Sequence, residues 1–342
     1  MLLAQAPAAA PADPLAAEVE RCLALAADER AGDEFTRPLR SGSLAPMRQA
    51  QADLAAGRRL AALHRLATLR ANLGGASHVD AVAAGESDEA GFEKEWQRVG
   101  GLLSKTDAPR AALAVLHSAA LRAEAEATLP QAALLHEASL EYARNTEPQY
   151  GLYYLGSALA AQEFPALCVS LETPAERAAP PLRSIRTELD ALQQLLLAAY
   201  RPPVSVERHA EFVGASSALK EARALDLAGQ RHGALLRYLT AWARSAPLVD
   251  AAPAPAPEDL VRQLDGFEER IRDPKLDHGI AQVFLEYARS ELAAAPGTAA
   301  PLAVSIARHS LPAYFAALEP AAPAAAAIAP VADLTLVRWP FT

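Results

Sequence analysis

Apolar residues recur along most of this chain at spacings of three and four residues, the period of one face of an α-helix. In the first such run, residues 14–32, the side chains of Leu15, Val19, Cys22 and Ala26 share one face. Only in the last ten residues do β-branched and aromatic residues displace alanine. The pattern predicts an all-α protein with a single strand candidate at its end.

Glycine and proline divide the helical pattern into segments. We expect breaks at Gly57 and at Gly74-Gly75, and helix starts at Pro130 and Pro148, because proline costs no hydrogen bond in the first turn. Thr146 and Gln149 have the spacing of a capping box. The predicted helices cover 14–32, 45–73 in two parts, 91–104, 108–128, 131–144, 148–172, 182–200, 206–228, 231–245, a segment that starts at Pro257, 275–295 and 300–317.

Segments rich in alanine and proline predict the domain organisation. The divisions are a leader or signal-peptide remnant at 1–13, a helical-repeat region at 14–250, a linker at 251–257, C-terminal helices at 258–317, a second linker at 318–332 and an apolar, strand-like tail at 333–342. The predicted fold is therefore an all-α array of antiparallel helical hairpins, either solenoid-like or an irregular bundle, with a short C-terminal β-type tail.

Two of the predicted hairpins share a spacing of small and large residues. The first has Ala50, Gly57, Ala62, Leu66 and Leu69, and the second has Ala222, Gly229, Ala234, Tyr238 and Ala241. Small side chains let antiparallel helices approach closely, and a turn glycine tolerates a positive φ. This spacing resembles the tetratricopeptide repeat, which implies a helical scaffold.

Residues 152–159 also resemble the first helix of such a repeat, although Glu163 stands where the turn glycine is expected. The remaining helices do not follow a regular period of about 34 residues. An irregular helical bundle is therefore the alternative architecture.

Composition supports a packed helical protein and restricts its partners. Of 342 residues, 51% are hydrophobic, and alanine, the strongest helix former, makes up about a quarter of the chain. The net charge of −9 argues against nucleic acid, because phosphate backbones are bound by clustered Lys and Arg. No segment approaches the roughly 20 consecutive apolar residues of a membrane span.

The N-terminus and the two cysteines bear on location. Residues 1–7 resemble the end of a secretory signal, which suggests a periplasmic or other extracytoplasmic protein; an ordinary N-terminus and a cytoplasmic location are the alternative. Cys22 and Cys168 each stand at core spacing in a predicted helix. We expect buried free thiols, with one disulfide as the alternative.

Motifs for metal or cofactor chemistry are absent from the sequence. No two of the eight histidines lie within four residues of each other, and no cysteine pair has zinc-ligand spacing. The paired carboxylates Glu93/Glu95, Glu124/Glu126 and Glu268/Glu269 fit solvated helix faces rather than acid–base catalysis. We predict no metal, no cofactor and no catalytic residue.

Aromatic residues are the candidate binding groups. Tyr150, Tyr153 and Tyr154 fall on one helical surface, with Tyr142 nearby, and they either pack between hairpins or form a binding surface. In the tail, Trp339 and Phe341 are too apolar to favour solvent. The tail should therefore dock, either on this chain or on a partner by strand addition.

These features favour a non-enzymatic helical-repeat scaffold that binds a partner protein or serves as a subunit of an assembly. Two alternatives are an enzyme whose residues converge from distant helices and a helical bundle that binds a small ligand. An enzyme predicts a concave pocket with perturbed titratable groups, whereas a scaffold predicts a groove lined by Tyr, Arg and Leu.

Overall fold

The computed structural model describes residues 13–28, 32, 34–83, 88–105, 107–173, 177–202, 206–250, 253–295, 297 and 300–319. Helices account for 83% of these residues, and no strand occurs among them beyond one isolated bridge between Ala178 and Leu276. The all-α prediction is therefore confirmed. No helix in this part of the chain is long and apolar enough to cross a membrane. The predicted tail at 333–342 lies outside the described residues.

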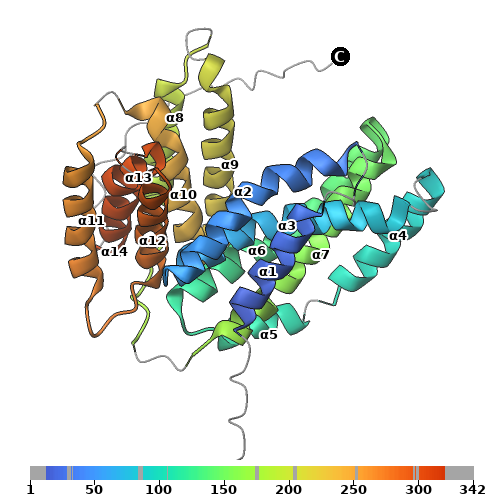
Figure 1. Cartoon of the computed structure of the whole chain (residues 1–342), viewed down its shortest axis with the longest axis horizontal. Helices are drawn as coiled ribbons and strands as arrows, with labels where there is room; N and C mark the ends of the chain where they lie inside the picture. The colour runs from blue at the N-terminus through green and yellow to red at the C-terminus, as the bar shows by residue number, and fades with distance from the viewer. Residues whose placement is uncertain are drawn as a thin grey trace, which may run out of the picture.

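The first half of the chain forms one group of helices (Figure 1). They are α1 (Pro14–Ala27), α2 (Thr36–Ala55), α3 (Arg59–Ala83), α4 (Glu89–Leu103), α5 (Asp107–Val115), α6 (Ala119–Asn145) and α7 (Pro148–Leu171). Helix α7 packs against both α6 and α3, and α3 packs against α2. The buried core of this group includes Leu15, Met47, Leu66 and Phe164.

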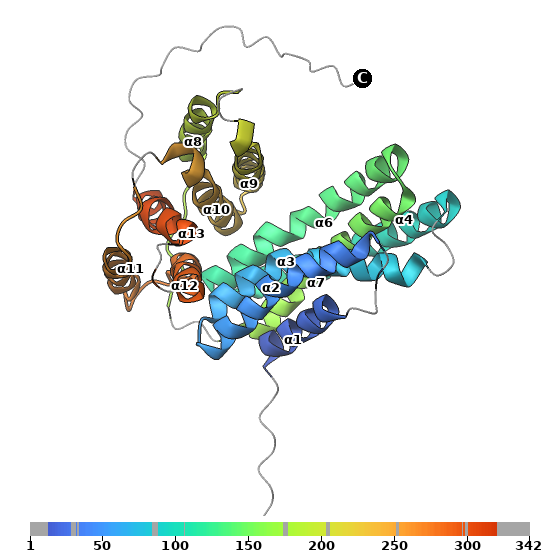
Figure 2. The same cartoon turned by 45° about the horizontal axis from the view of Figure 1, so that its top comes forward.

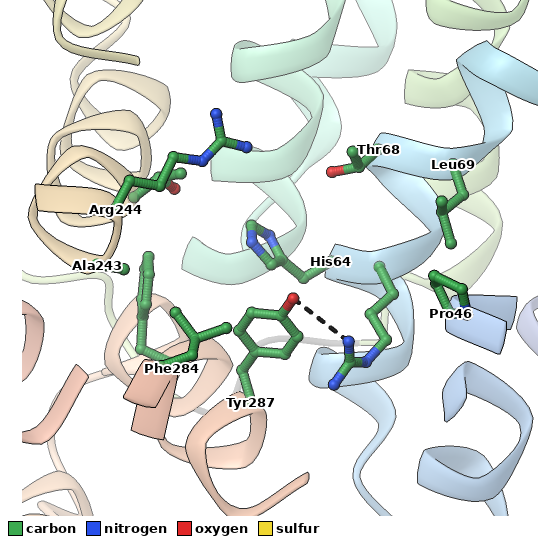
Figure 3. Close-up of a pocket in the computed structure, with 11 residues that line it drawn as sticks. Pro46, His64, Thr68, Leu69, Ala243, Arg244, Phe284 and Tyr287 are labelled. Carbon is green, nitrogen blue, oxygen red and sulfur yellow. Dashed lines mark hydrogen bonds between the residues drawn. The ribbon is translucent and has the colours of Figure 1, made fainter. Parts of the chain in front are cut away.

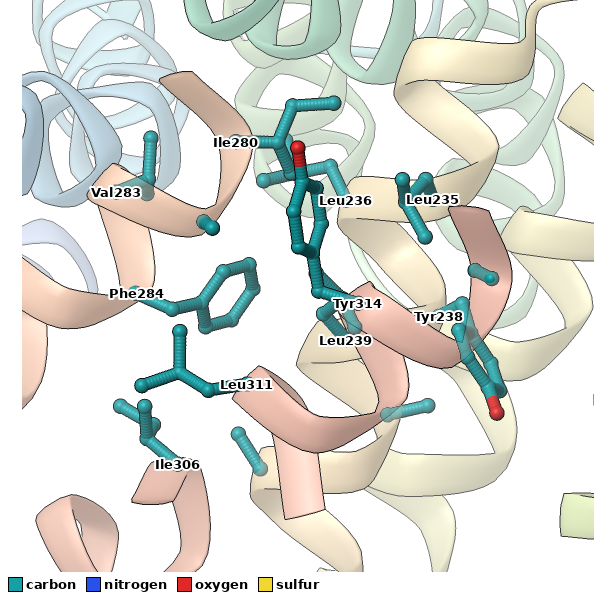
Figure 4. Packing of buried hydrophobic residues seen from close by; sticks show 14 of the residues in the cluster. Leu235, Leu236, Tyr238, Leu239, Ile280, Val283, Phe284, Ile306, Leu311 and Tyr314 are labelled. Carbon is teal, nitrogen blue, oxygen red and sulfur yellow. The ribbon is translucent and has the colours of Figure 1, made fainter. Parts of the chain in front are cut away.

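The second half forms a group beside the first (Figures 1 and 2). Its elements are α8 (Arg186–Ala199), η1 (Val206–Arg208), α9 (His209–Leu227), α10 (Arg231–Val249), α11 (Pro257–Ile271), α12 (Gly279–Ala294), α13 (Pro301–Ser305), η2 (Ile306–Ser310) and α14 (Leu311–Leu318). Leu236 and Leu239 of α10 pack with Phe284 and Tyr314 in one buried cluster (Figure 4). Helices on both sides of residues 251–257, the predicted linker, contribute to this core.

The N-terminal part of α6 belongs to both groups. Ala119, Ala123 and Ala127 join the core of the second group, whereas Leu121 and Ala125 join the core of the first. The alternation arises because these two sets lie on different faces of the same helix. Helix α6 therefore contributes to both cores and joins the two groups.

Both predicted glycine turns are present. Gly57 joins α2 to α3 with a φ of +76°, and Gly229 joins α9 to α10 with a φ of +77°. The helices of each pair pack on each other. These are the two hairpins on which the repeat resemblance rests.

The predicted break at Gly74-Gly75 is wrong, because α3 continues to Ala83. These glycines lie where α3 crosses α7: a Cβ on Gly74 would stand 2.7 Å from the Cβ of Ala160, and one on Gly75 would stand 2.5 Å from the Oγ of Ser157. The missing side chains allow close helix contact instead of a turn.

Three further boundaries also differ from the prediction. Helix α6 runs through Pro130 without ending, and Arg237 donates a hydrogen bond to the nearby Ala127 carbonyl. Helix α7 continues through Glu163, so the third predicted hairpin has no turn. Pro148 does occupy the first turn of α7, but Thr146 donates its hydroxyl to the Tyr142 carbonyl and does not cap that helix. At Pro130, the packing of α6 against α10 outweighs the local signal.

The turn at Gly229 supplies a stability prediction. No atom lies within 4 Å of a Cβ built there, so replacement by alanine tests only the positive φ. We expect Gly229→Ala to lower the free energy of unfolding by about 1–2 kcal/mol. The control is Gly266→Ala at an exposed position of α11, which should raise the free energy of unfolding by roughly 0.5–1 kcal/mol because alanine favours a helix. Urea denaturation measures both, and equal effects would contradict the turn assignment.

The crossing of α3 and α7 supplies a second prediction. A Cβ on Gly156 of α7 would stand 2.7 Å from the Gly74 carbonyl oxygen and even closer to the Cβ of His78. Gly156→Ala should therefore cost about 1–3 kcal/mol through overpacking, despite the higher helix propensity of alanine. Urea denaturation of Gly156→Ala and of the control Gly266→Ala measures the free energy of unfolding of both variants. A Gly156→Ala protein more stable than the wild type would refute the close crossing.

Candidate functional site

A cavity of about 300 Å³ lies where α3, α10 and α12 meet, at the junction of the two helical groups (Figure 3). Its lining consists of Pro46, His64, Arg65, Thr68, Leu69, Thr240, Ala243, Arg244, Phe284, Tyr287 and Leu302. Tyrosine, arginine and leucine side chains thus occur together in its lining. The cavity also has the mixed aromatic and polar character of a ligand pocket.

The cavity is bordered by a buried pair between α3 and α6. The Nδ1 atom of His64 lies 2.6 Å from the Oε1 atom of Glu124, whose side chain is 3% exposed. Because Nδ1 is occupied by this contact, Nε2 is the ring nitrogen of His64 that a ligand could engage.

The prediction that Glu124 and Glu126 lie on a solvated face is wrong, since both are buried. Two positions apart on α6, they reach different helices: Glu124 pairs with His64 of α3, whereas Glu126 accepts a hydrogen bond of 2.9 Å from the Gly233 backbone N–H of α10. Arg122 also donates to Glu126. Buried carboxylates need such partners, which sequence spacing does not reveal.

Arg65 is the centre of a polar network behind the cavity. Its guanidinium donates to Asp53 at 3.1 Å and to Glu291 at 2.5 Å, and lies 4.3 Å from the centre of the Tyr287 ring. Asp53, which is completely buried, also accepts a hydrogen bond of 2.9 Å from Arg58. The charge of Arg65 is therefore already compensated by protein groups.

Helix α12 is held against α3 by a backbone cap. The Glu286 carboxylate accepts hydrogen bonds from the backbone N–H groups of Leu60 and Ala61, at 2.8 and 3.1 Å. These are unpaired donors in the first turn of α3, where the helix dipole also favours a negative charge. This contact keeps Phe284 and Tyr287 of α12 in position at the cavity.

Arg244 lines the cavity, and Figure 3 shows its side chain extending from α10 toward the side of the His64 ring. Its side chain is exposed, and within the described part of the chain it donates one hydrogen bond, of 3.4 Å, to the Gly214 carbonyl. Thr68 is exposed on the opposite side of the mouth. Burial raises the pKa of Tyr287, so its phenol stays protonated near neutral pH.

The predicted tyrosines gather at another place, around the junction of α6 and α7. The rings of Tyr142 and Tyr154 stack with centroids 4.4 Å apart, and the Tyr150 ring lies 4.5 Å from that of Phe35. Tyr153 contacts both Phe35 and Tyr154 and donates its hydroxyl to Asn72. We call these five rings the aromatic cluster. The other two predicted binding residues, Trp339 and Phe341, lie outside the described residues.

Other candidate chemistry is limited. Cys22 and Cys168 are free and buried, as their helical spacing predicts, and burial raises the pKa of Cys22 to about 11 and that of Cys168 further. In the described ranges, no group of three or more His, Cys, Asp or Glu side chains is placed to hold a metal ion. The thiols of Cys22 and Cys168 are therefore protonated at neutral pH and are poor nucleophiles.

Several important residues were not singled out from the sequence. Asp53, Arg65 and Glu286 resemble ordinary charged helix residues, and the available signal was a histidine and an arginine directly after the apolar residues 60–63 of α3. Each has a partner more than 200 residues away in the sequence: Ser290 donates to Asp53, Arg65 donates to Tyr287, and the start of α3 donates to Glu286. No protein-family model, curated protein or solved structure matches the chain.

Buried histidines make stability depend on pH. Burial lowers the pKa of His232 below its ordinary value of 6.5, although Glu126 opposes the shift; His78 and His278 shift in the same direction, also through burial. The unfolded chain therefore binds protons more readily than the folded protein. The contribution of these neutral histidines to the free energy of unfolding is present above about pH 6.5. It is lost as the pH falls through their lowered pKa values.

We expect the melting temperature of the wild type to fall as the pH is lowered from 7 to 5.5. The change of melting temperature with pH should be smaller in His232→Gln. His117→Gln is the control, because His117 is exposed in the segment between α5 and α6. Thermal melts at constant ionic strength check this. If the pH dependence of the melting temperature were reduced equally in both variants, His232 would be excluded as its source.

Proposed function

We propose that this protein is a non-enzymatic helical scaffold that binds a partner protein, and that the aromatic cluster forms part of the contact surface. The observation that carries the proposal is the cluster itself, in which Tyr142 and Tyr150 remain 41% and 36% exposed although their rings are packed on neighbours. Tyrosines held in this way offer a large contact area at a small entropic cost on binding.

The rigidity of the cluster supports a binding role. Its rings come from three parts of the chain: the residue before α2, the end of α6 and the start of α7. Gly151 allows α7 to approach α6 there, because a Cβ on it would stand 2.7 Å from the Cβ of Ala143. A surface assembled by such close packing keeps its shape before a partner arrives.

The central cavity supports binding rather than catalysis. Arg65 is held in ion pairs, the His64 ring is held by Glu124, burial keeps Tyr287 protonated, and the two buried thiols are not among the lining residues. An activated nucleophile with its own base is absent from the eleven lining residues. The hairpins at Gly57 and Gly229 also support a scaffold role, because they resemble the tetratricopeptide repeat, which is used in scaffolds. We extend the proposed surface to Trp339 and Phe341, as apolar groups suited to a partner.

Replacement of the exposed rings tests this proposal. The double variant Tyr142→Ala/Tyr150→Ala removes contact area, and Tyr200→Ala is the matched control because Tyr200 is also partly exposed and stacks on an aromatic ring, that of Phe212. Proteins cross-linked to the wild type are identified by mass spectrometry and then purified for binding assays. We expect the double variant to lose affinity for them by about tenfold or more, and Tyr200→Ala to retain it.

Circular dichroism and thermal melts must show that the double variant remains folded. Sedimentation of the purified protein shows whether the partner is a second copy of this chain. Undiminished affinity of the folded double variant for every cross-linked protein would refute a contact role for the cluster.

A further inference from the structure

The central cavity has the size of a site for one small molecule. Its volume of about 300 Å³ lies at the lower end of the range for ligand pockets. The deep part is aromatic: the His64 ring centre lies 5.9 Å from that of Phe284 and 5.4 Å from that of Tyr287. One ring or a short hydrocarbon chain could lie against these side chains.

Polar groups converge at the open side of the same cavity. Figure 3 shows the Arg244 guanidinium and the Thr68 hydroxyl on opposite sides of the mouth, with the His64 ring between them and deeper. Thr68 is exposed, and its hydroxyl has no hydrogen-bond partner among the described residues, although it can donate one hydrogen bond. A ligand with an apolar body and a polar head would thus be bound along its whole length.

The charges around the cavity favour a negative head. None of the eleven lining residues is Asp or Glu. Behind the lining, Asp53 and Glu291 compensate Arg58 and Arg65, and Glu124 pairs with His64. Arg244 has no carboxylate within salt-bridge distance among the described residues, so its positive charge is available to a ligand.

We propose that this cavity binds a small organic monoanion, with its carboxylate at Arg244 and Thr68 and its apolar body against Phe284 and Tyr287. One uncompensated arginine in a chain of net charge −9 selects a single negative charge over a polyanion. This site is separate from the aromatic cluster, so the inference does not depend on the proposed partner surface.

Calorimetric titration of the full-length protein with three probes tests the proposal. The probes are 3-phenylpropionate, its neutral amide 3-phenylpropionamide, and acetate, which carries the charge without the apolar body. We expect saturable binding of one equivalent of 3-phenylpropionate, affinity for the amide lower by about tenfold or more, and no detectable binding of acetate at millimolar concentration. Absence of saturable binding by 3-phenylpropionate, or equal affinity for its amide, would overturn the proposal.

Variants then assign the binding to this cavity. Arg244→Gln should reduce the affinity for 3-phenylpropionate to that of the amide, without changing the amide itself. Arg262→Gln is the matched control, because Arg262 is an exposed arginine on α11, away from the lining residues. Ala243→Leu should abolish binding of both phenyl compounds by filling the cavity, provided that its melting temperature stays near that of the wild type. Unchanged affinity in folded Arg244→Gln would exclude Arg244 as the anion-binding group.

Discussion

The arrangement of this protein depends on burying two carboxylates of α6 between the two groups of helices. Glu124 and Glu126 are both buried, and an unpaired charge at such a depth would be very costly. Glu124 pairs with His64 of α3, and Glu126 accepts the Gly233 backbone N–H of α10. Because each partner comes from a different group, satisfying both carboxylates fixes how the groups meet.

The cavity is a consequence of that junction. Helices α3, α10 and α12 converge beside α6, where His64 is held by Glu124 and α12 is held by the Glu286 cap on α3. The Arg65 side chain is held in ion pairs with Asp53 and Glu291 and cannot fold inward to fill the remaining space. This leaves an aromatic cavity with Arg244 at its mouth, an arginine that pairs with no carboxylate among the described residues. The aromatic cluster lies elsewhere, where α6 ends and α7 begins, so the two surfaces can serve separate binding events.

Much of the fold was predictable because helix formation is largely a local matter. The three-and-four spacing identified the helices, and the turns at Gly57 and Gly229 were recognised because small residues flank each glycine at the same spacing in both hairpins. The grouping of the tyrosines was also expected from helical neighbours 150, 153 and 154. The cavity was not predicted, because its residues, from Pro46 to Leu302, are separated by up to 256 positions and carry no motif.

The sequence by itself determined the helical class, the two glycine turns and the buried positions of Cys22 and Cys168, since these follow from local propensity and periodicity. Tertiary structure alone decided that Gly74 and Gly75 make a helix contact instead of a turn, and that Glu124 and Glu126 are buried instead of solvated. A glycine or a glutamate has the same local preferences in both roles. The difference lies in which side chain from a distant helix stands opposite, and only the packed structure specifies that.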